Sequence, residues 1–155
     1  MIEFLTHHGL ASNWNVWERC LLLRKTGAQQ HGVSLGQMER TASPGDANDG
    51  DLAVHVVQWE NDGDIVGYAR LYPRPIRGNF DASRPRMRLE LERVCTERTS
   101  EDTDEMVRAR LGRLIIAILG HARSHDYDLI SGYGEIGGIS ALEDLGIAVS
   151  AYGSG

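Results

Sequence analysis

The chain has 155 residues, of which 41% are hydrophobic and 25% are charged, and its formal net charge at pH 7 is -6. This length fits one domain, expected to span residues 1–155, with the composition of a soluble globular protein. A negative net charge argues against general binding to nucleic acid, and no apolar stretch is long enough to cross a membrane.

The cysteine and histidine content argues against a disulfide framework and a metal site. Cys20 and Cys95 form no Cys-x-x-Cys pair, so both are expected to be reduced thiols of a cytoplasmic protein. The N-terminal residues contain no basic region followed by a long apolar run, so no signal peptide is expected. His121 and His125 have ligand-like spacing, but without a third ligand this pair predicts no metal site.

The first third of the chain predicts a strand, a helix and a long loop. A short apolar run at residues 1–6 is typical of a strand. Apolar residues then recur at helical spacing over residues 13–27, and Gly27 is expected to end this helix. The polar segment at 29–50, rich in Gly and Ser, is expected to be a loop with one turn of helix at most, and loops of this length are often functional.

The middle of the chain predicts a hairpin. Residues 52–59 form a strand pattern, and Asp62-Gly63 is a strong hairpin signal. The return strand is expected at 65–72, where Pro73 and Pro75 should stop it. A basic loop follows the prolines.

The third meander strand and the clearest helix come next. Residues 87–95 alternate between apolar and charged side chains, which is typical of a half-buried strand. Ser100 is expected to cap a helix, with acidic residues in its first turns and a buried stripe that begins at Met106. A strand at 127–131, a helix at 139–145 and a strand at 147–152 complete the expected elements.

This order of elements predicts the fold class. An antiparallel meander followed by βαβ-like units indicates an α/β fold, with a mixed, mainly antiparallel central sheet and flanking helices. The order resembles the GNAT-type acyltransferase fold, and a resemblance in topology alone does not fix a function.

Two carboxylates on the third meander strand are candidates for acid–base chemistry. Glu90 and Glu92 are two residues apart, so they face the same side of the strand and are expected to raise each other's pKa. A buried carboxylate with a raised pKa can accept a proton from an amine. The alternative is a solvated face on which both glutamates pair with Arg88 or Arg93.

The block "DLAVHVVQWENDGDIVGYARLYPRPIRGNF", followed by "LELERVCTE", resembles the acyl-homoserine-lactone synthases, the autoinducer synthases of bacterial quorum sensing. The family motifs G-x-x-R-L-x-P and W-E-x-S-R correspond to Gly67–Pro73 and to the segment that contains Glu90 and Arg93. The "LRK" segment at 23–25 is similar to the family's N-terminal arginine motif, and the resemblance extends over most of residues 20 to 153.

The resemblance implies an acyltransferase with a GNAT-like fold. Such an enzyme acylates the amine of S-adenosylmethionine from an acyl-carrier-protein thioester, or from acyl-CoA, and then closes the lactone. Both molecules are substrates, so no cofactor is implied. Glu90 takes the place of the general base. The substrate-binding positions are Arg24, Asp46, Asp49, Arg70 and Arg93.

Each substrate-binding position also has a structural alternative. Asp46 and Asp49 either attract the cationic substrate or belong to an ordinary solvated turn. Arg24 either pairs with one of these aspartates or lies on the surface in the last helical turn. Arg70, between two apolar residues, either has a carboxylate partner (Glu90, Asp46 or Asp49) or occupies an exposed position.

A run of arginines lies around the predicted catalytic strand. An acidic enzyme needs a local cationic site to bind a strongly acidic carrier protein. The expected docking residues are Arg74, Arg77, Arg84, Arg86 and Arg88. The alternatives are a solvated loop, or a site for phosphate or RNA.

Two further functions fit the same residues. One is a different GNAT-type enzyme that acylates another amine from acyl-CoA. Ala28 and Ser34, where the synthases carry Phe and Trp, favour it, whereas the absence of the pyrophosphate loop Q/R-x-x-G-x-G/A disfavours it. The other is a non-catalytic relative that binds an acidic partner or a small ligand.

Overall fold

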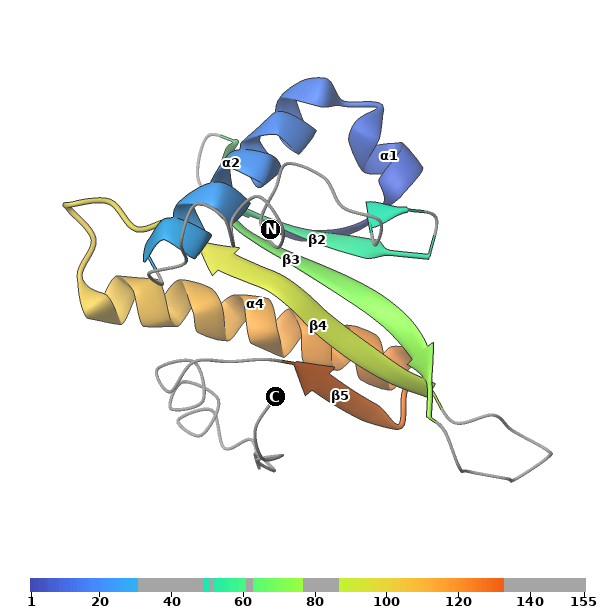
Figure 1. Cartoon of the computed structure of the whole chain (residues 1–155). Coiled ribbons are helices and arrows are strands. Elements are labelled where there is room, and N and C mark those ends of the chain that lie inside the picture. The colour runs from blue at the N-terminus through green and yellow to red at the C-terminus, as the bar shows by residue number, and fades with distance from the viewer. Residues whose placement is uncertain (31–48, 51, 61–62, 77–86, 133–155) are drawn as a thin grey trace.

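A five-stranded sheet with helices on both faces forms the body of the protein (Figure 1). The computed structural model describes residues 1–30, 49–50, 52–60, 63–76 and 87–132. The strands are β1 (Ile2–Thr6), β2 (Val54–Glu60), β3 (Asp64–Pro75), β4 (Met87–Thr96) and β5 (Leu129–Gly132). The helices are α1 (His7–Ala11), α2 (Trp14–Gln30) and α4 (Asp104–Ser124).

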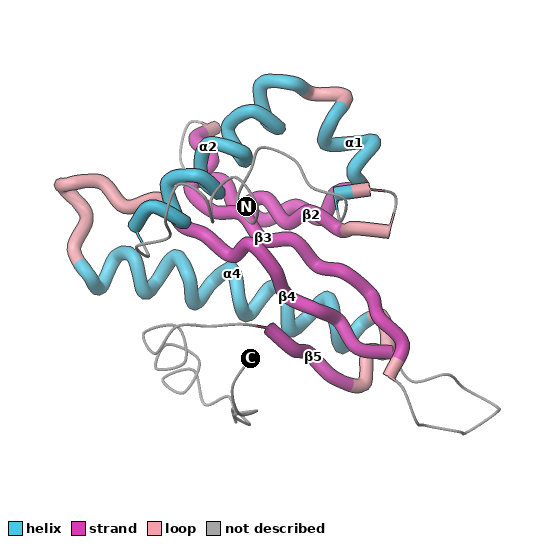
Figure 2. The backbone as a smooth tube through the Cα atoms, in the orientation of Figure 1, coloured by secondary structure: helices cyan, strands magenta, loops and turns pink. Residues whose placement is uncertain are grey.

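The sheet is mixed and mainly antiparallel, as the sequence predicts. Its strands lie in the order β1-β2-β3-β4-β5, and each neighbouring pair from β1 to β4 is antiparallel. Figure 2 shows β2, β3, β4 and β5 one after another in this order. β4 and β5 pair in parallel, from Arg88 opposite Leu129 to Leu91 opposite Gly132. A parallel pair needs a crossover connection, and α4 supplies it.

Two hydrophobic clusters cover the two faces of the sheet. On one face, α1 and α2 bury a cluster against β2 and β3 that includes Leu10, Trp17, Cys20, Leu23, Val57 and Tyr68. On the other face, α4 buries a second cluster that includes Val56, Ala69, Leu71, Leu89, Leu114 and Ile118. Alternation along the strands therefore sends neighbouring residues to opposite cores.

A β-bulge in β4 changes which residues face each core. Tyr68 pairs with Cys95 and Arg70 pairs with Glu92, so β4 carries one residue more than β3 in this interval. Arg93 has a φ of 53°, the left-handed conformation of a bulge residue. Because of the extra residue, Val94 packs with the α4 cluster, whereas Cys95 packs with the α2 cluster.

Both cysteines are free thiols in the α2 cluster, and burial raises the pKa of each to about 12. A thiol with such a pKa is protonated at neutral pH, which makes Cys20 and Cys95 poor nucleophiles. Their part in the molecule is core packing.

The expectation that Pro73 and Pro75 stop β3 is wrong, since the strand continues to Pro75. β2 accompanies β3 only as far as Leu71, which pairs with Val54. Beyond that residue, β3 has β4 as its one described neighbour, with Pro73 opposite Leu89. Proline is tolerated on such a free edge because the missing N–H would have pointed away from the partner strand.

The helix boundaries also differ from those expected. α2 does not end at Gly27 but continues to Gln30, because glycine costs a helix only about 1 kcal/mol and terminates it mainly where a positive φ is needed. The short helix α1 was not predicted. α4 is capped by Thr103 rather than Ser100, and Met106 is 45% exposed rather than buried.

Several predicted features lie outside the described residues, namely most of the loop at 29–50, the helix at 139–145 and the strand at 147–152. Within the described part, no helix is both long enough and apolar enough to span a membrane.

Gly67 in β3 provides a test of the packing between β2 and α4. A Cβ atom at this position would lie 2.2 Å from Gln58 Oε1 and 3.0 Å from Gln58 Cβ. Gln58 is buried, and its Nε2 donates a hydrogen bond of 2.9 Å to the carbonyl of Arg110 in α4. We expect Gly67→Ala to displace Gln58 and to lower the free energy of unfolding by about 1–3 kcal/mol, measured by urea denaturation. A variant as stable as the wild type would show that Gln58 moves without cost.

Candidate active site

The candidate site lies on the face of the sheet that α2 partly covers. Residues directly opposite each other in an antiparallel pair point to the same face. Arg70 is opposite Glu92, Tyr72 is opposite Glu90, and Arg74 is opposite Arg88. Tyr68, two residues before Arg70, belongs to the α2 cluster, so these alternate residues share the α2 face.

Glu90 lies beside a pocket. Its side chain is 15% exposed, and with Arg74, Pro75 and Arg88 it lines an open pocket of about 420 Å³ in the described part of the chain. Arg74 Nε donates a hydrogen bond to Glu90, and Arg88 Nη2 lies 4.0 Å from Glu90 Oε2. A carboxylate between two guanidinium groups at a pocket suits a ligand that carries both positive and negative charge.

Arg74 is held from two sides. Its guanidinium carbon lies 4.6 Å from the centroid of the Tyr72 ring, a cation–π contact, while its Nε binds Glu90. The hydrogen bond to Glu90 raises the pKa of Arg74 further above its usual value. Arg74 Nη2 also lies 3.7 Å from Glu92 Oε1, so this arginine connects the two carboxylates of β4.

Two polar atoms near the pocket are buried without a hydrogen-bond partner in the described part of the chain. One is Nε of Arg88, which lines the pocket. The other is Oγ of Ser131 on β5, and Ser131 is opposite Glu90 in the parallel register. Buried polar atoms of this kind are commonly satisfied by a ligand or by water.

A buried ionic network adjoins the pocket. Arg24 of α2 donates from Nη1 to both oxygens of Asp49, at 3.0 and 3.2 Å. Arg70 Nη1 donates to Asp49 Oδ1 at 2.8 Å, and Arg70 Nε donates to Glu92 Oε2 at 2.8 Å. The residues Arg24, Asp49 and Arg70 are only 3%, 4% and 1% exposed. Asp49 therefore connects α2 to β3, and Arg70 of β3 connects Asp49 to Glu92 of β4.

A chain of polar rings lies on the same face. His7 Nδ1 is 3.2 Å from His55 Nε2, and His55 Nδ1 is 2.6 Å from the Tyr68 hydroxyl. Burial lowers the pKa of His55 to about 4 and raises the pKa of Tyr68. His55 is therefore neutral at pH 7, which lets it accept one hydrogen bond and donate another.

The lowered pKa of His55 makes stability depend on pH. The unfolded chain takes up a proton near pH 6.5, whereas the folded protein resists protonation down to about pH 4. The contribution of His55 is thus complete above pH 6.5 and is lost as the pH falls toward 4. We expect the wild type to lose about 2 kcal/mol more than His55→Gln between pH 7 and pH 5, measured by urea denaturation. Equal losses in the two proteins would contradict this assignment.

The structure brings together six of the residues predicted from the sequence. Arg24, Asp49 and Arg70 form the buried network, and Glu90, Arg74 and Arg88 meet at the pocket. Arg93 lies at the bulge of β4, three residues after Glu90. The other predicted site residues lie outside the described residues: Asp46, Arg77, Arg84 and Arg86.

Sequence reasoning missed several polar residues of this face. Arg70 pairs with Glu92 as well as Asp49, although Glu92 was not among its expected partners. His55 and Tyr68 were also missed, although a histidine inside the apolar run "AVHVV" was a usable signal of a buried polar group. Tyr72 and Ser131 carried no pattern that marks a site. Among the described residues, no three His, Cys, Asp or Glu side chains gather as metal ligands do.

Comparison with known proteins defines the fold. No family model and no curated protein sequence matches the chain. A ribosomal-protein-alanine N-acetyltransferase from Brucella melitensis biovar Abortus 2308 superposes with a TM-score of 0.61 at 13% identity, covering 99% of this chain and 96% of that one. The fold is that of the GNAT acetyltransferases.

Other solved structures with the GNAT fold are similar over nearly their full length. A predicted acetyltransferase from Clostridium acetobutylicum, determined with acetyl-CoA, gives a TM-score of 0.59 at 14% identity over 97% of this chain and 92% of that one. Glucosamine-6-phosphate N-acetyltransferase from Arabidopsis thaliana gives 0.57 at 12% identity over 100% and 97%. At such identities the likeness concerns the GNAT fold and not the substrate.

Proposed function

We propose that the protein is an N-acyltransferase in which Glu90 accepts a proton from an amine that attacks an acyl thioester. The observation that carries this proposal is the position of Glu90, a largely buried carboxylate at the wall of a pocket on a GNAT fold. The amine nitrogen loses its proton to Glu90 and forms a bond to the thioester carbon. The carbon–sulfur bond then breaks, and the leaving thiolate takes the proton from Glu90 and departs as a thiol.

Within this class, we propose S-adenosylmethionine as the amine and an N-acyl-homoserine lactone as the product. The amino-acid part of this substrate carries an ammonium and a carboxylate, which complement Glu90 and the two arginines of the pocket. After acylation, a carboxylate oxygen attacks the carbon that bears the sulfonium, and sulfur leaves as a neutral thioether. The resemblance of residues 51–97 to the autoinducer synthases supports this choice.

Mass spectrometry of the products tests this proposal. The full chain is incubated with S-adenosylmethionine and an acyl thioester of a carrier protein, and the products are compared with those of Glu90→Gln. An acyl-homoserine lactone formed only by the wild type is the expected result. Release of an acylated amine without lactone would exclude the synthase function but keep the acyltransferase function.

The second candidate is an N-acetyltransferase that takes its acyl group from acyl-CoA and acts on another amine. The names of the similar solved structures favour it, since one of them was determined with acetyl-CoA. The same assay distinguishes the two candidates, because this enzyme would consume acetyl-CoA in the presence of simple amines and leave S-adenosylmethionine unchanged.

For the acyl donor we propose docking at the arginine run beside β4. Arg74 and Arg88 are each 36% exposed at their side chains, so both reach the pocket and the surface. We expect the double variant Arg84→Ser and Arg86→Ser to bind acyl carrier protein more weakly and with a flatter dependence on salt, measured by calorimetry at several salt concentrations. Binding that stays as strong and as salt-sensitive as before would argue against docking at this run.

A further inference from the structure

The N-terminus of α4 is the place where this fold would be expected to hold the pyrophosphate of a coenzyme A thioester. In open α/β sheets, ligands bind beyond the carboxyl ends of parallel strands. β4 and β5 are the parallel pair, and β4 leads from Glu90 toward the start of α4. A helix N-terminus also binds phosphate groups through its free N–H groups and its dipole.

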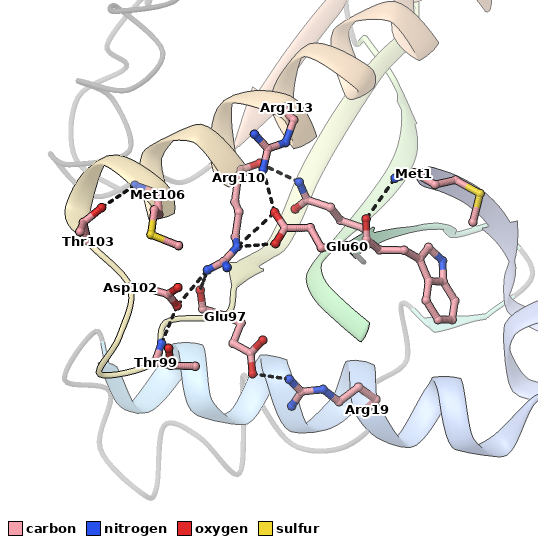
Figure 3. Close-up of polar contacts among 12 residues, drawn as sticks. Met1, Arg19, Glu60, Glu97, Thr99, Asp102, Thr103, Met106, Arg110 and Arg113 are labelled. Carbon is pink, nitrogen blue, oxygen red and sulfur yellow. Dashed lines mark hydrogen bonds and ion pairs between the residues drawn. The ribbon is translucent and has the colours of Figure 1, made fainter. Parts of the chain in front are cut away.

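In this protein the turn before α4 already contains an anion of its own. Asp102 Oδ2 accepts a hydrogen bond from the N–H of Thr99 at 2.8 Å and another from Arg110 Nη1 at 2.9 Å (Figure 3). The Asp102 side chain is only 6% exposed. Arg110 Nε additionally contacts both carboxylate oxygens of Glu60, at 3.3 and 3.2 Å, so this guanidinium is committed to internal partners.

The backbone N–H groups of Thr99 and Met106 are also in use. Thr103 is the N-cap of α4, and its side chain accepts the N–H of Met106 at 3.2 Å. The hydrogen bond from Arg110 holds the pKa of Asp102 down at about 2, so this carboxylate is ionised at neutral pH. A phosphate group would therefore find Arg110 and the N–H groups of Thr99 and Met106 already bonded within the turn.

The surrounding charge opposes a phosphate as well. Residues 97–105 contain five carboxylates and one guanidinium, that of Arg98, which pairs with Asp104. Two of the carboxylates, Glu101 and Glu105, are exposed at the beginning of α4. Carboxylates at a helix N-terminus interact favourably with the dipole, and they repel a second anion.

We infer that the N-terminus of α4 excludes the nucleotide of coenzyme A, and that Asp102, Glu101 and Glu105 make the enzyme selective for pantetheine thioesters that lack this nucleotide. The part of this inference that concerns the acyl donor rests on the proposed acyltransferase function. The exclusion of phosphate at α4 stands on the geometry alone.

A binding experiment tests the exclusion without any turnover. The ¹⁵N-labelled full chain is titrated with coenzyme A, adenosine 3′,5′-bisphosphate and inorganic pyrophosphate, and the amide signals of Asp104, Glu105 and Met106 are followed. We expect no saturable shift of these signals. A saturable shift with any of the three ligands would overturn the inference, whether or not the protein transfers acyl groups.

A kinetic comparison tests the selectivity. Acyl-CoA and the matching acyl-4′-phosphopantetheine differ only in the nucleotide, and we expect acyl-CoA to have the lower kcat/KM. The double variant Glu101→Gln and Glu105→Gln is expected to raise kcat/KM for acyl-CoA about three- to thirtyfold and to leave that of acyl-phosphopantetheine unchanged. Glu18→Gln, an exposed site on α2, is the control for net charge.

The outcomes separate the inference from the proposed function. If neither donor reacts while the α4 amides stay unshifted, the acyltransferase proposal fails and the exclusion of phosphate is supported. If both donors react and acyl-CoA has an equal or higher kcat/KM, the inferred selectivity is wrong and the acyltransferase proposal stands.

Discussion

Glu90→Gln is expected to lower kcat for acyl transfer by about 10²- to 10⁴-fold, the usual contribution of a general base. Gln has almost the shape of Glu and still accepts a hydrogen bond from Arg74, but it cannot take a proton from the amine. The rate is measured by the release of free thiol from the acyl thioester. Circular dichroism and thermal unfolding verify that the variant keeps the fold.

The matched control for this variant is Glu18→Gln, which removes one carboxylate from an exposed position of α2. We expect this control to have wild-type turnover. If Glu90→Gln were also as active as the wild type, Glu90 would have no part in proton transfer, and the pocket beside it would be a binding site only.

Asp49→Asn is expected to lower the free energy of unfolding by about 3–5 kcal/mol, the usual cost of removing one partner from a buried ion pair. Asp49 is the carboxylate shared by Arg24 and Arg70, which are both almost completely buried. The neutral amide leaves two buried guanidinium groups with less compensating charge. Urea denaturation at pH 7 measures this loss.

Asp104→Asn is the matched control, because Asp104 also pairs with an arginine, Arg98, but on the exposed surface. Exposed ion pairs contribute little to stability, so this control is expected to unfold at nearly the same urea concentration as the wild type. Equal stability of Asp49→Asn and Asp104→Asn would mean that the buried network contributes nothing beyond an ordinary surface pair.

Much of the sheet and part of the site could be predicted from the sequence, because both depend on local alternation. The pattern at 87–95 placed Glu90 and Glu92 on one face, and the register confirms it. The strand position of Arg70 required a partner, and the structure supplies Asp49 and Glu92. The sequence offers Arg24 an aspartate as one of two possible surroundings, and in the structure Arg24 contacts Asp49.

The remaining features depend on tertiary contacts that leave no local pattern. The bulge at Arg93 accompanies a register shift between β3 and β4. The residue pattern of β4 alone does not reveal such a shift. Strand β3 can include Pro73 because β2, which begins at Val54 opposite Leu71, does not extend alongside Pro73. The cap at Thr103, in place of Ser100, depends on Asp102 and Arg110 fixing the preceding turn.

The pH dependence of kcat/KM tests most directly whether the carboxylate of Glu90 takes the proton. In the wild type we expect kcat/KM to fall on the acid side through one ionisation, because the protonated acid cannot act as a base. The residual activity of Glu90→Gln should lack this acid limb. An acid limb of the same midpoint and slope in both proteins would contradict proton transfer to Glu90.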